Sequence, residues 1–337
     1  MSSAAIPYHL RPHKAVDRRL FLDLLSKCER WKSLTNHTYV SMGAYPLEDQ
    51  KQIHRLLGIK KLISFDYNLK VVDRQQFNKP VVDSHCLEAS SSDMISNLDK
   101  KIDECGIKNT GVIFWLDYTD PKEFKSQIRE FQTLLDSLAK GDIVRLTVNA
   151  EAIALGPKYP DPRPNYMAIL QEKRLRKLKQ RIGDYLPSSV VAGDMTNARL
   201  PLVYCKVIAE AARQAFPSHH SRTFLPLSLV RYADGHQMLS VTGIIINRKD
   251  NDDFLKRSLL RKWPFWSRDW SHVHKLVVPS LTLRERLFLE KLVTSSTPSK
   301  IIKEIGFDEA EGISMKDFLV SYKKYYRFYP SLLALEI

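Results

Sequence analysis

The sequence lacks the features of disulfide-rich, zinc-binding and membrane-spanning proteins. Its four cysteines, Cys28, Cys86, Cys105 and Cys205, lie far apart and form no C-x-x-C pair, so neither a disulfide framework nor a cysteine zinc site is expected. No segment reaches ~18 uninterrupted apolar residues, and the N-terminal stretch has no apolar core of a secretory signal. We therefore expect a cytoplasmic protein that does not associate with membranes.

Motifs of several enzyme classes are also missing. There is no G-x-S-x-G, P-loop, H-E-x-x-H or Cys/His nucleophile motif, which argues against hydrolases and kinases. His219-His220 and His272-x-His274 have no acidic or cysteine partner at a matching spacing, so we expect no metal site. Positive charge is abundant instead: 52 Lys and Arg against 38 Asp and Glu give a net charge of +14. This balance favours polyanions, nucleic acid among them, as partners.

From Thr38 onward, short apolar runs alternate with helical stretches, the pattern of strand-helix-strand units. Five candidate parallel strands are TYVSMG, KKLISFDYN, PVVDSHCLEA, TGVIFWLDY and DIVRLTVNA. Two further runs, Leu227 to Tyr232 and Met238 to Asn247, flank the hairpin signal Asp234-Gly235 and should be antiparallel. A mostly parallel sheet closed by an antiparallel hairpin predicts an α/β, Rossmann-like class I methyltransferase fold, whereas a dinucleotide dehydrogenase should continue in parallel.

The other segments divide the chain of 337 residues further. Residues 1–36 are expected to form an N-terminal helical leader, because Leu20, Phe21, Leu24 and Leu25 recur at helical spacing. Residues 37–150 and 200–247 should form the Rossmann-like domain. Between them, residues 151–199 are a proline-rich, basic insertion, and residues 248–337 should form a helical C-terminal region.

The loop after the first strand, SMGAYPLED from Ser41 to Asp49, is where a doubly wound sheet binds its ligand. It has one glycine and no G-x-G-x-x-G fingerprint, which disfavours NAD or FAD. Glu48 and Asp49 would also repel a phosphate at the start of the following helix. S-adenosylmethionine, with a sulfonium, an amino group and no phosphate, suits this loop better. The alternative is that both carboxylates only cap the helix.

Asp66 ends the second strand, 23 residues after Gly43. This is close to the spacing of the acidic residue that binds ribose hydroxyls in nucleoside-binding sheets. An aspartate at a strand end is also a common turn former. Together with the loop, the spacing supports a nucleoside-containing cofactor.

Several stretches together resemble a bacterial family of O-methyltransferases with the class I fold. They are YHLRPHKAVDRRLF, YVSMGAYPLEDQKQIHRLLGIKKLISFDYN, RQQFNKP, FWLDYTDPKEF, KGDIVRLTVNA and YKKYYRFYP, and they extend over nearly the whole chain. The resemblance implies S-adenosylmethionine as cofactor, in a pocket that includes Ser41, Met42, Gly43, Ala44 and Asp66. The chain departs from common methyltransferase patterns in having a single glycine in the loop and an aspartate where glutamate is also usual.

Asp117 and Tyr118 follow the fourth strand, which in this topology ends beside the methyl group of the cofactor. Asp117 is suited to orienting or deprotonating an acceptor hydroxyl or amine, and Tyr118 to stacking on a planar acceptor. We predict both as catalytic residues. Asp120-Pro121 is more simply the start of the next helix.

The stretch from Glu172 to Arg181 holds six Lys or Arg against one Glu. Such a surface suits phosphates, although a solvated helix face is the alternative. The predicted contacts to substrate or nucleic acid are Arg11, Lys14, Arg18, Lys173, Arg174, Arg176 and Lys177. The leading hypothesis is thus an S-adenosylmethionine-dependent methyltransferase with nucleic acid as one candidate acceptor. The alternatives are a methyltransferase fold that has lost turnover and serves as a nucleic-acid-binding or scaffold subunit, and, more weakly, an NAD-dependent enzyme.

Overall fold

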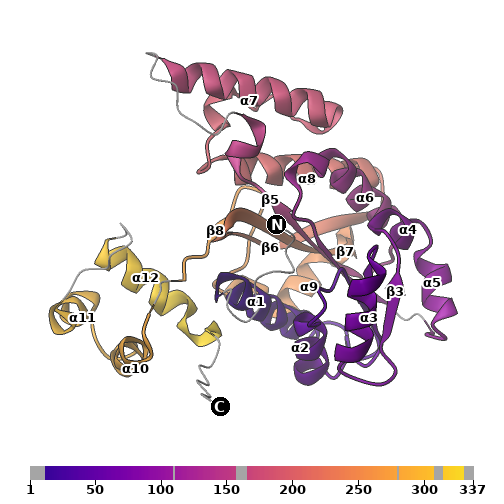
Figure 1. Cartoon of the computed structure of the whole chain (residues 1–337), viewed down its shortest axis with the longest axis horizontal. Coiled ribbons are helices and arrows are strands. Elements are labelled where there is room, and N and C mark those ends of the chain that lie inside the picture. The colour runs from indigo at the N-terminus through magenta and orange to yellow at the C-terminus, as the bar shows by residue number, and fades with distance from the viewer. Residues whose placement is uncertain (1–11, 109–110, 157–164, 279–280, 307–313, 330–337) are drawn as a thin grey trace.

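A computed structural model of the chain describes residues 12–108, 111–156, 165–278, 281–306 and 314–329. At its centre lies an eight-stranded sheet with the order β3-β2-β1-β4-β5-β7-β6-β8 (Figure 1). The strands are β1 (Thr38–Ser41), β2 (Leu62–Asp66), β3 (His85–Glu88), β4 (Val112–Asp117), β5 (Ile143–Asn149), β6 (Arg222–Asp234), β7 (His236–Asn247) and β8 (His274–Lys275). Strands β1 to β5 pair in parallel, and β7 is antiparallel to both β5 and β6. The predicted class I methyltransferase fold is confirmed.

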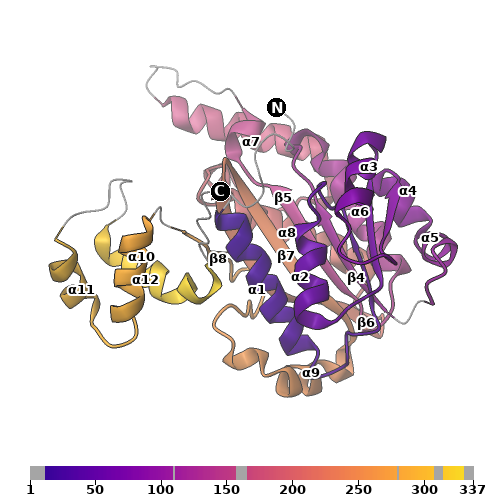
Figure 2. The same ribbon diagram turned by 60° about the horizontal axis from the view of Figure 1, so that its bottom comes forward.

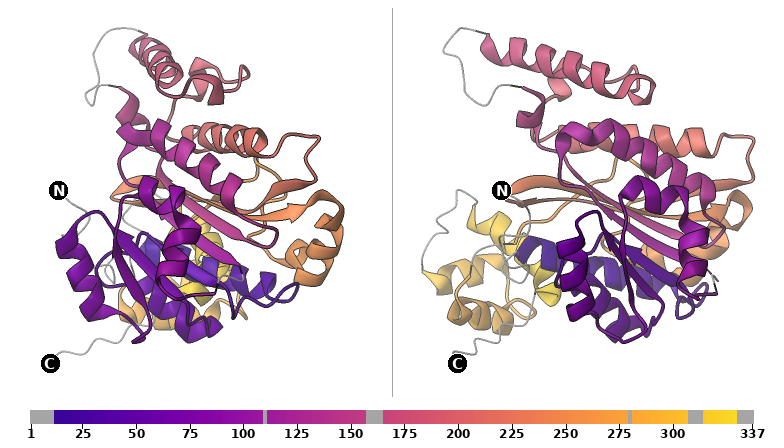
Figure 3. Two further views of the ribbon diagram at one scale, coloured as in Figure 1. Left: turned by 90° about the vertical axis from the view of Figure 1, so that its right-hand side faces the viewer. Right: turned by 45° about the vertical axis from the view of Figure 1, so that its right-hand side comes forward.

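Helices cover both faces of this sheet (Figures 2 and 3). One apolar core joins the sheet to α4 (Ser91–Ser96), α5 (Leu98–Glu104), α6 (Phe124–Ser137) and α8 (Leu200–Ala215). The other core joins it to α1 (Pro12–Cys28), α2 (Glu48–Leu57), α9 (Asn251–Ser258) and the C-terminal helices α10 (Leu283–Leu292), α11 (Pro298–Ile305) and α12 (Met315–Tyr325). Strand β4 supplies both cores, because Phe114 faces the first and Trp115 the second.

The hairpin lies where the sequence predicts it, with Gly235 between its strands at a φ of 73° that favours glycine. Both strands are longer than the apolar runs indicate. The register shifts between Pro226 and Ser228, because proline cannot donate a ladder hydrogen bond. The C-terminal region is helical but also contributes β8, whose two residues are parallel to β6 and cover part of that edge.

Helix α7 (Tyr166–Ile182) lies within the expected insertion and stands apart from the sheet in Figure 1. Helix α3 (Leu69–Asn78) follows β2.

All four cysteines are unpaired. None of the helices in the described ranges has the length and hydrophobicity that a bilayer crossing requires.

Candidate active site

A cavity lies at the carboxyl ends of β1 and β4, the point where the strand order reverses and a doubly wound sheet binds its ligand. Helix α1 forms one wall, and the strand ends with the loop after β1 form the other. The lining residues are Lys14, Arg18, Ser41, Met42, Gly43, Ala44, Asp49, Trp115 and Asp117. The structure thus brings together most of the loop predicted for the cofactor with the predicted acceptor residue Asp117.

The loop after β1 is held from behind by buried polar contacts. Gln75 of α3 donates to the Gly43 carbonyl and accepts a 3.0 Å hydrogen bond from the Ser64 hydroxyl. A Cβ on Gly43 would lie 2.7 Å from a methyl carbon of Leu47, so the loop leaves little room for a side chain here. Leu47, in the left-handed region at a φ of 51°, then turns the chain into α2. A larger residue at position 43 would therefore have to displace the Leu47 side chain.

The two acidic residues at the start of α2 have different surroundings. Asp49 lines the cavity and accepts a 2.9 Å hydrogen bond from the buried hydroxyl of Tyr39. Burial and the Asp49 carboxylate together raise the pKa of Tyr39, so this hydroxyl remains a donor. Glu48 is outside the cavity lining and forms a half-exposed ion pair with Lys51 at 3.4 Å. Neither residue is a side-chain cap, because the residue at the N-cap position is Leu47.

Asp66 ends β2, one strand away from the cavity and at the same edge of the sheet. One of its oxygens accepts a 2.8 Å hydrogen bond from the Asn68 backbone, which makes the turn into α3. Partial burial raises the pKa of the Asp66 carboxyl. The residue is thus a turn former by geometry, with a partly desolvated carboxylate at the ligand-binding edge.

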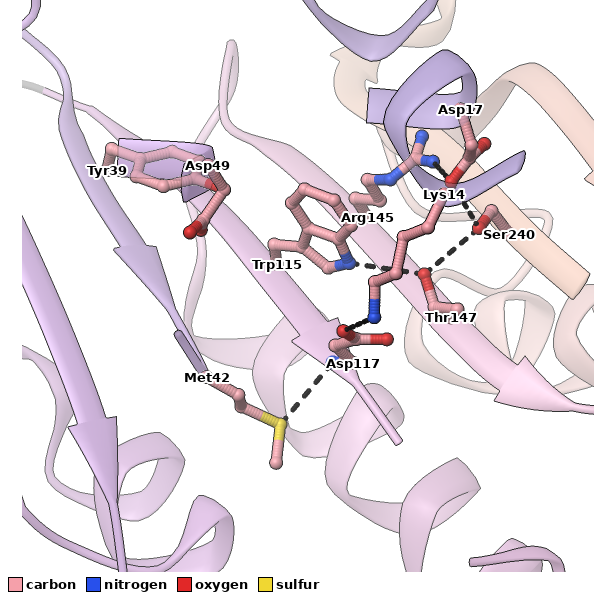
Figure 4. Close-up of polar contacts among 10 residues, drawn as sticks. All are labelled: Lys14, Asp17, Tyr39, Met42, Asp49, Trp115, Asp117, Arg145, Thr147 and Ser240. Atoms are coloured by element: carbon pink, nitrogen blue, oxygen red, sulfur yellow. Dashed lines mark hydrogen bonds and ion pairs between the residues drawn. The ribbon is translucent and has the colours of Figure 1, made fainter. Parts of the chain in front are cut away.

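Lys14 and Asp117 form an ion pair at 2.5 Å across the cavity (Figure 4). Only 6% of the Lys14 side chain and 14% of the Asp117 side chain are exposed. The Met42 sulfur accepts a 3.4 Å hydrogen bond from the Asp117 backbone. The space between these side chains measures about 20 Å³, room for about one water, so a larger group enters only if lining side chains rearrange.

Two buried polar atoms of the cavity residues, Ser41 Oγ and Asp117 Oδ1, have no hydrogen-bond partner among the described residues. A buried unsatisfied polar atom costs about 1–3 kcal/mol. A polar ligand would remove that cost. Both atoms are thus available to a polar ligand of this cavity.

Sequence reasoning missed a polar cluster beneath α1, which includes Asp17, Trp115, Arg145, Thr147 and Ser240 (Figure 4). A signal was present, because the polar residues Arg145 and Thr147 recur every second position in an apolar strand. That spacing puts them on one face of the sheet.

Other predicted site residues lie away from the cavity. Tyr118 is buried in the core on the opposite face and donates its hydroxyl to Glu130. Burial and the Glu130 carboxylate raise the pKa of Tyr118. Asp120, which is not a predicted site residue, caps the turn after β4 through a 2.8 Å hydrogen bond from the Lys122 backbone, which confirms its predicted place at the start of the next helix.

The predicted basic contacts fall into three groups. Lys14 and Arg18 line the cavity. Lys173, Arg176 and Lys177 are exposed on α7. Arg174 is buried, donates to the Met195 carbonyl at 3.0 Å, and has its pKa lowered by burial. Arg11 lies outside the described residues, and within those residues no group of three His, Cys, Asp or Glu is placed to hold a metal ion.

Comparison with known proteins gives one family. A family model described as "Putative O-methyltransferase" matches residues 6–337. No curated protein matches the chain significantly. The match to the family therefore extends over the cavity, the sheet and both ends of the described chain.

Solved structures are similar at the level of fold alone. A "putative methyltransferase" from Thermobifida fusca shows 11% identity over 69% of this chain and 82% of its own, with a TM-score of 0.40. A DUF574 family protein from Streptomyces avermitilis shows 8% identity over 68% and 82%, with a TM-score of 0.37. Trm1 from Pyrococcus horikoshii, solved with S-adenosyl-L-methionine, shows 12% identity over 72% and 58%, with a TM-score of 0.39.

Proposed function

The chain belongs to the O-methyltransferase family that matches residues 6–337, and from this premise we propose that the cavity between α1, β1 and β4 binds the amino-acid end of S-adenosylmethionine. The observation that supports this most directly is the charge arrangement of the cavity. Lys14 and Arg18 lie on the wall formed by α1, and Asp49 and Asp117 come from α2 and β4. Two cations and two carboxylates around a buried hydroxyl complement a zwitterion.

S-adenosylmethionine presents matching groups. Its carboxylate is attracted by Lys14 and Arg18, and its ammonium by Asp49. Ser41 Oγ, buried and unpartnered in the described structure, can bond either group because a hydroxyl both donates and accepts. The Asp66 carboxylate at the neighbouring strand end is positioned for ribose hydroxyls. NAD is disfavoured, because its pyrophosphate would meet Asp49 and Glu48 at the start of α2.

When bound, S-adenosylmethionine supplies an activated methyl group, so the protein mainly aligns donor and acceptor. Asp117 is the carboxylate nearest to the expected acceptor position. Its buried Oδ1 has no hydrogen-bond partner in the described part of the chain. This oxygen can accept a hydrogen bond from the hydroxyl or amine of the methyl acceptor and take its proton. Lys14 donates to the other oxygen of this carboxylate.

The surface of α7 favours nucleic acid as the ligand. Nucleic acid would be the methyl acceptor of an active enzyme or the bound partner of an inactive protein. The exposed cations Lys173, Arg176 and Lys177 of this helix form no ion pair within the described residues, and they lie at helical spacings of three and four that share one face. A cationic helix face binds phosphates without reading sequence. Tyr118, buried as it is, does not contribute to such a surface.

The test is a calorimetric titration of the protein with S-adenosylmethionine, S-adenosylhomocysteine and NAD, repeated on Asp66→Ala. We expect both sulfur compounds to bind at micromolar concentrations, the variant to bind them at least tenfold more weakly, and NAD not to bind. Binding of NAD in preference to the sulfur compounds would overturn the proposal. Absence of all binding would favour the scaffold or nucleic-acid-binding alternative.

A further inference from the structure

Helix α1 contacts the sheet through an apolar face and a polar face. Its apolar residues, among them Val16, Leu20, Leu24 and Leu25, are fully or almost fully buried. Apolar burial holds a helix against a sheet but is non-directional. The rotation and longitudinal position of α1, and hence the position of Lys14 and Arg18, must be fixed by directional contacts.

One directional contact joins α1 to the central strand β5. Asp17 is ion-paired and hydrogen-bonded to Arg145, and their side chains are 0% and 2% exposed. The central carbon of the Arg145 guanidinium lies 4.8 Å from the ring centroids of both Phe21 and Trp115, and these two rings pack edge to face against each other. A second nitrogen donates to the Thr242 hydroxyl at 2.8 Å. Arg145 is thus held by α1, β4 and β7 together.

A hydroxyl chain extends this contact toward the cavity. Ser240 donates to Asp17 at 3.2 Å, its hydroxyl is 3.0 Å from that of Thr147, and the Trp115 indole nitrogen donates to Thr147 at 3.1 Å. Trp115 itself lines the cavity. Figure 4 shows these side chains on the same face of the sheet as Lys14 and Asp117.

Sequence spacing links this cluster to the cavity. Lys14, Asp17 and Phe21 are three and then four residues apart, so they share one face of α1. On the sheet, Trp115 pairs in register with Arg145, and Asp117 pairs with Thr147 two residues further along. Two contacts, Asp17 with Arg145 and Lys14 with Asp117, therefore join the same helix face to the same sheet face.

We propose that the buried Asp17–Arg145 pair is a positioning device that fixes α1 on the sheet so that Lys14 forms the wall of the cofactor cavity. The role of Lys14 in binding cofactor rests on the proposed function. The placement of α1 on the sheet by Asp17 and Arg145 does not depend on it. Arg145 is not one of the residues that line the cavity; it contacts α1 through Asp17 and the lining residue Trp115 through its ring, and we infer that it acts through α1.

The energetics of buried ion pairs support a role beyond stability. Replacing a buried pair by apolar residues of similar volume is often neutral or stabilising, whereas removing one partner is strongly destabilising. A buried pair at this position is therefore better explained by the orientation it imposes on α1 than by a net gain in stability. Asp17 Oδ1 and the Arg145 Nε have no hydrogen-bond partner among the described residues, which agrees with a contact that is not optimised for stability.

The test measures the position of Lys14 directly, as the rate at which an amine-reactive reagent labels it, followed by peptide mass spectrometry. In the wild-type protein Lys14 should be protected, because it is 5% exposed. We expect Arg145→Met and the apolar double variant Asp17→Leu/Arg145→Met to label at least tenfold faster at temperatures where circular dichroism shows them folded. The double variant keeps the test usable if Arg145→Met alone fails to fold.

Arg222→Met is the matched control. Like Arg145, Arg222 comes from a strand and lies near an aromatic ring, here Phe216. It donates a 2.7 Å hydrogen bond to the Leu138 backbone carbonyl. Its loss should lower the melting temperature without changing Lys14 labelling. Slow labelling of Lys14 in the folded double variant would overturn the proposal.

Cofactor affinity separates this proposal from the proposed function. If S-adenosylmethionine binds, Arg145→Met and Lys14→Met should each weaken binding about tenfold, and the combined variant should lose little more, because Arg145 acts through Lys14. Additive losses would contradict positioning. If the wild-type protein binds no cofactor while Lys14 labelling still responds to Arg145, the proposed function fails and the positioning role stands.

Discussion

At the scale of single residues, Asp66 is a site residue whose charge lowers the stability of the folded protein. Its carboxyl is partly desolvated, and burial raises its pKa above the ordinary value. An acid whose pKa is raised on folding destabilises the folded state increasingly as pH rises from the unfolded to the folded pKa, and fully above the folded pKa, because the folded state then holds the charge at a cost. A role in binding the ribose of the proposed cofactor would account for a carboxylate at this strand end.

Asp66→Asn should change stability and binding in opposite directions. The amide keeps the oxygen that accepts from the Asn68 backbone and removes the charge, so we expect the melting temperature to rise by roughly 1 °C at pH 7. The gain should disappear near pH 3, where the carboxyl is protonated in both states. Affinity for S-adenosylmethionine should fall about tenfold. Lower stability with unchanged affinity would show that Asp66 only forms the turn into α3 and does not bind cofactor.

At the scale of elements, the strands of the sheet were predictable from the sequence. Which side chains lie on which face of the sheet was predictable only in part. The alternation of apolar and helical runs and the signal at Asp234-Gly235 predicted the parallel strands and the hairpin. Alternation along β4 and into the residue after it places Trp115 and Asp117 toward the cavity and Tyr118 in the core on the other face. The same alternation in the sequence would have excluded Tyr118 from the cavity.

Other features had no local signal. The strand β8 has two residues, too short for a periodic pattern. The pairing of Asp17 with Arg145 joins residues 128 positions apart, and nothing in either segment specifies the other. The apolar spacing of α1 predicted a helix, but its role as a wall of the cavity depends on the polar positions between the apolar ones.

Helix α7 gives a prediction about nucleic acid. Replacing Lys173, Arg176 and Lys177 by glutamine should reduce the slope of log affinity against log salt for a single-stranded RNA oligonucleotide by about 2, since each phosphate contact contributes about 0.7. The measurement is fluorescence anisotropy over a series of salt concentrations.

Arg174→Met is the control for this helix. Arg174 is buried and bonds the Met195 carbonyl, so its loss should leave the salt slope unchanged. If the slope of the triple variant equals that of the wild-type protein, α7 is a solvated face and another surface must bind any nucleic acid.

At the scale of the whole molecule, two buried histidines connect folding to pH. Burial lowers the pKa of His37, next to β1, and of His274, in β8, to about 4 each. In the unfolded chain both titrate near pH 6.5. Unfolding therefore takes up protons below pH 6.5, and the folded state loses stability as pH falls from about 6.5 toward 4.

The variant His274→Gln should show a flatter dependence of unfolding free energy on pH. Between pH 6 and 4.5 we expect its slope to be smaller than that of the wild-type protein by up to about 1.4 kcal/mol per pH unit, the contribution of one proton. Denaturant titrations at several pH values measure this slope independently of any constant loss of stability. Equal slopes would mean that His274 is protonated in the folded protein or neutral in both states.

The central claim is that the cavity recognises the amino-acid end of S-adenosylmethionine through Lys14. The most direct measurement is the calorimetric affinity of the wild-type protein and of Lys14→Met for S-adenosylmethionine and for its decarboxylated analogue. We expect the wild-type protein to prefer the carboxylate form by about tenfold or more and Lys14→Met to lose most of this preference. Equal affinity of the wild-type protein for the two compounds would contradict it.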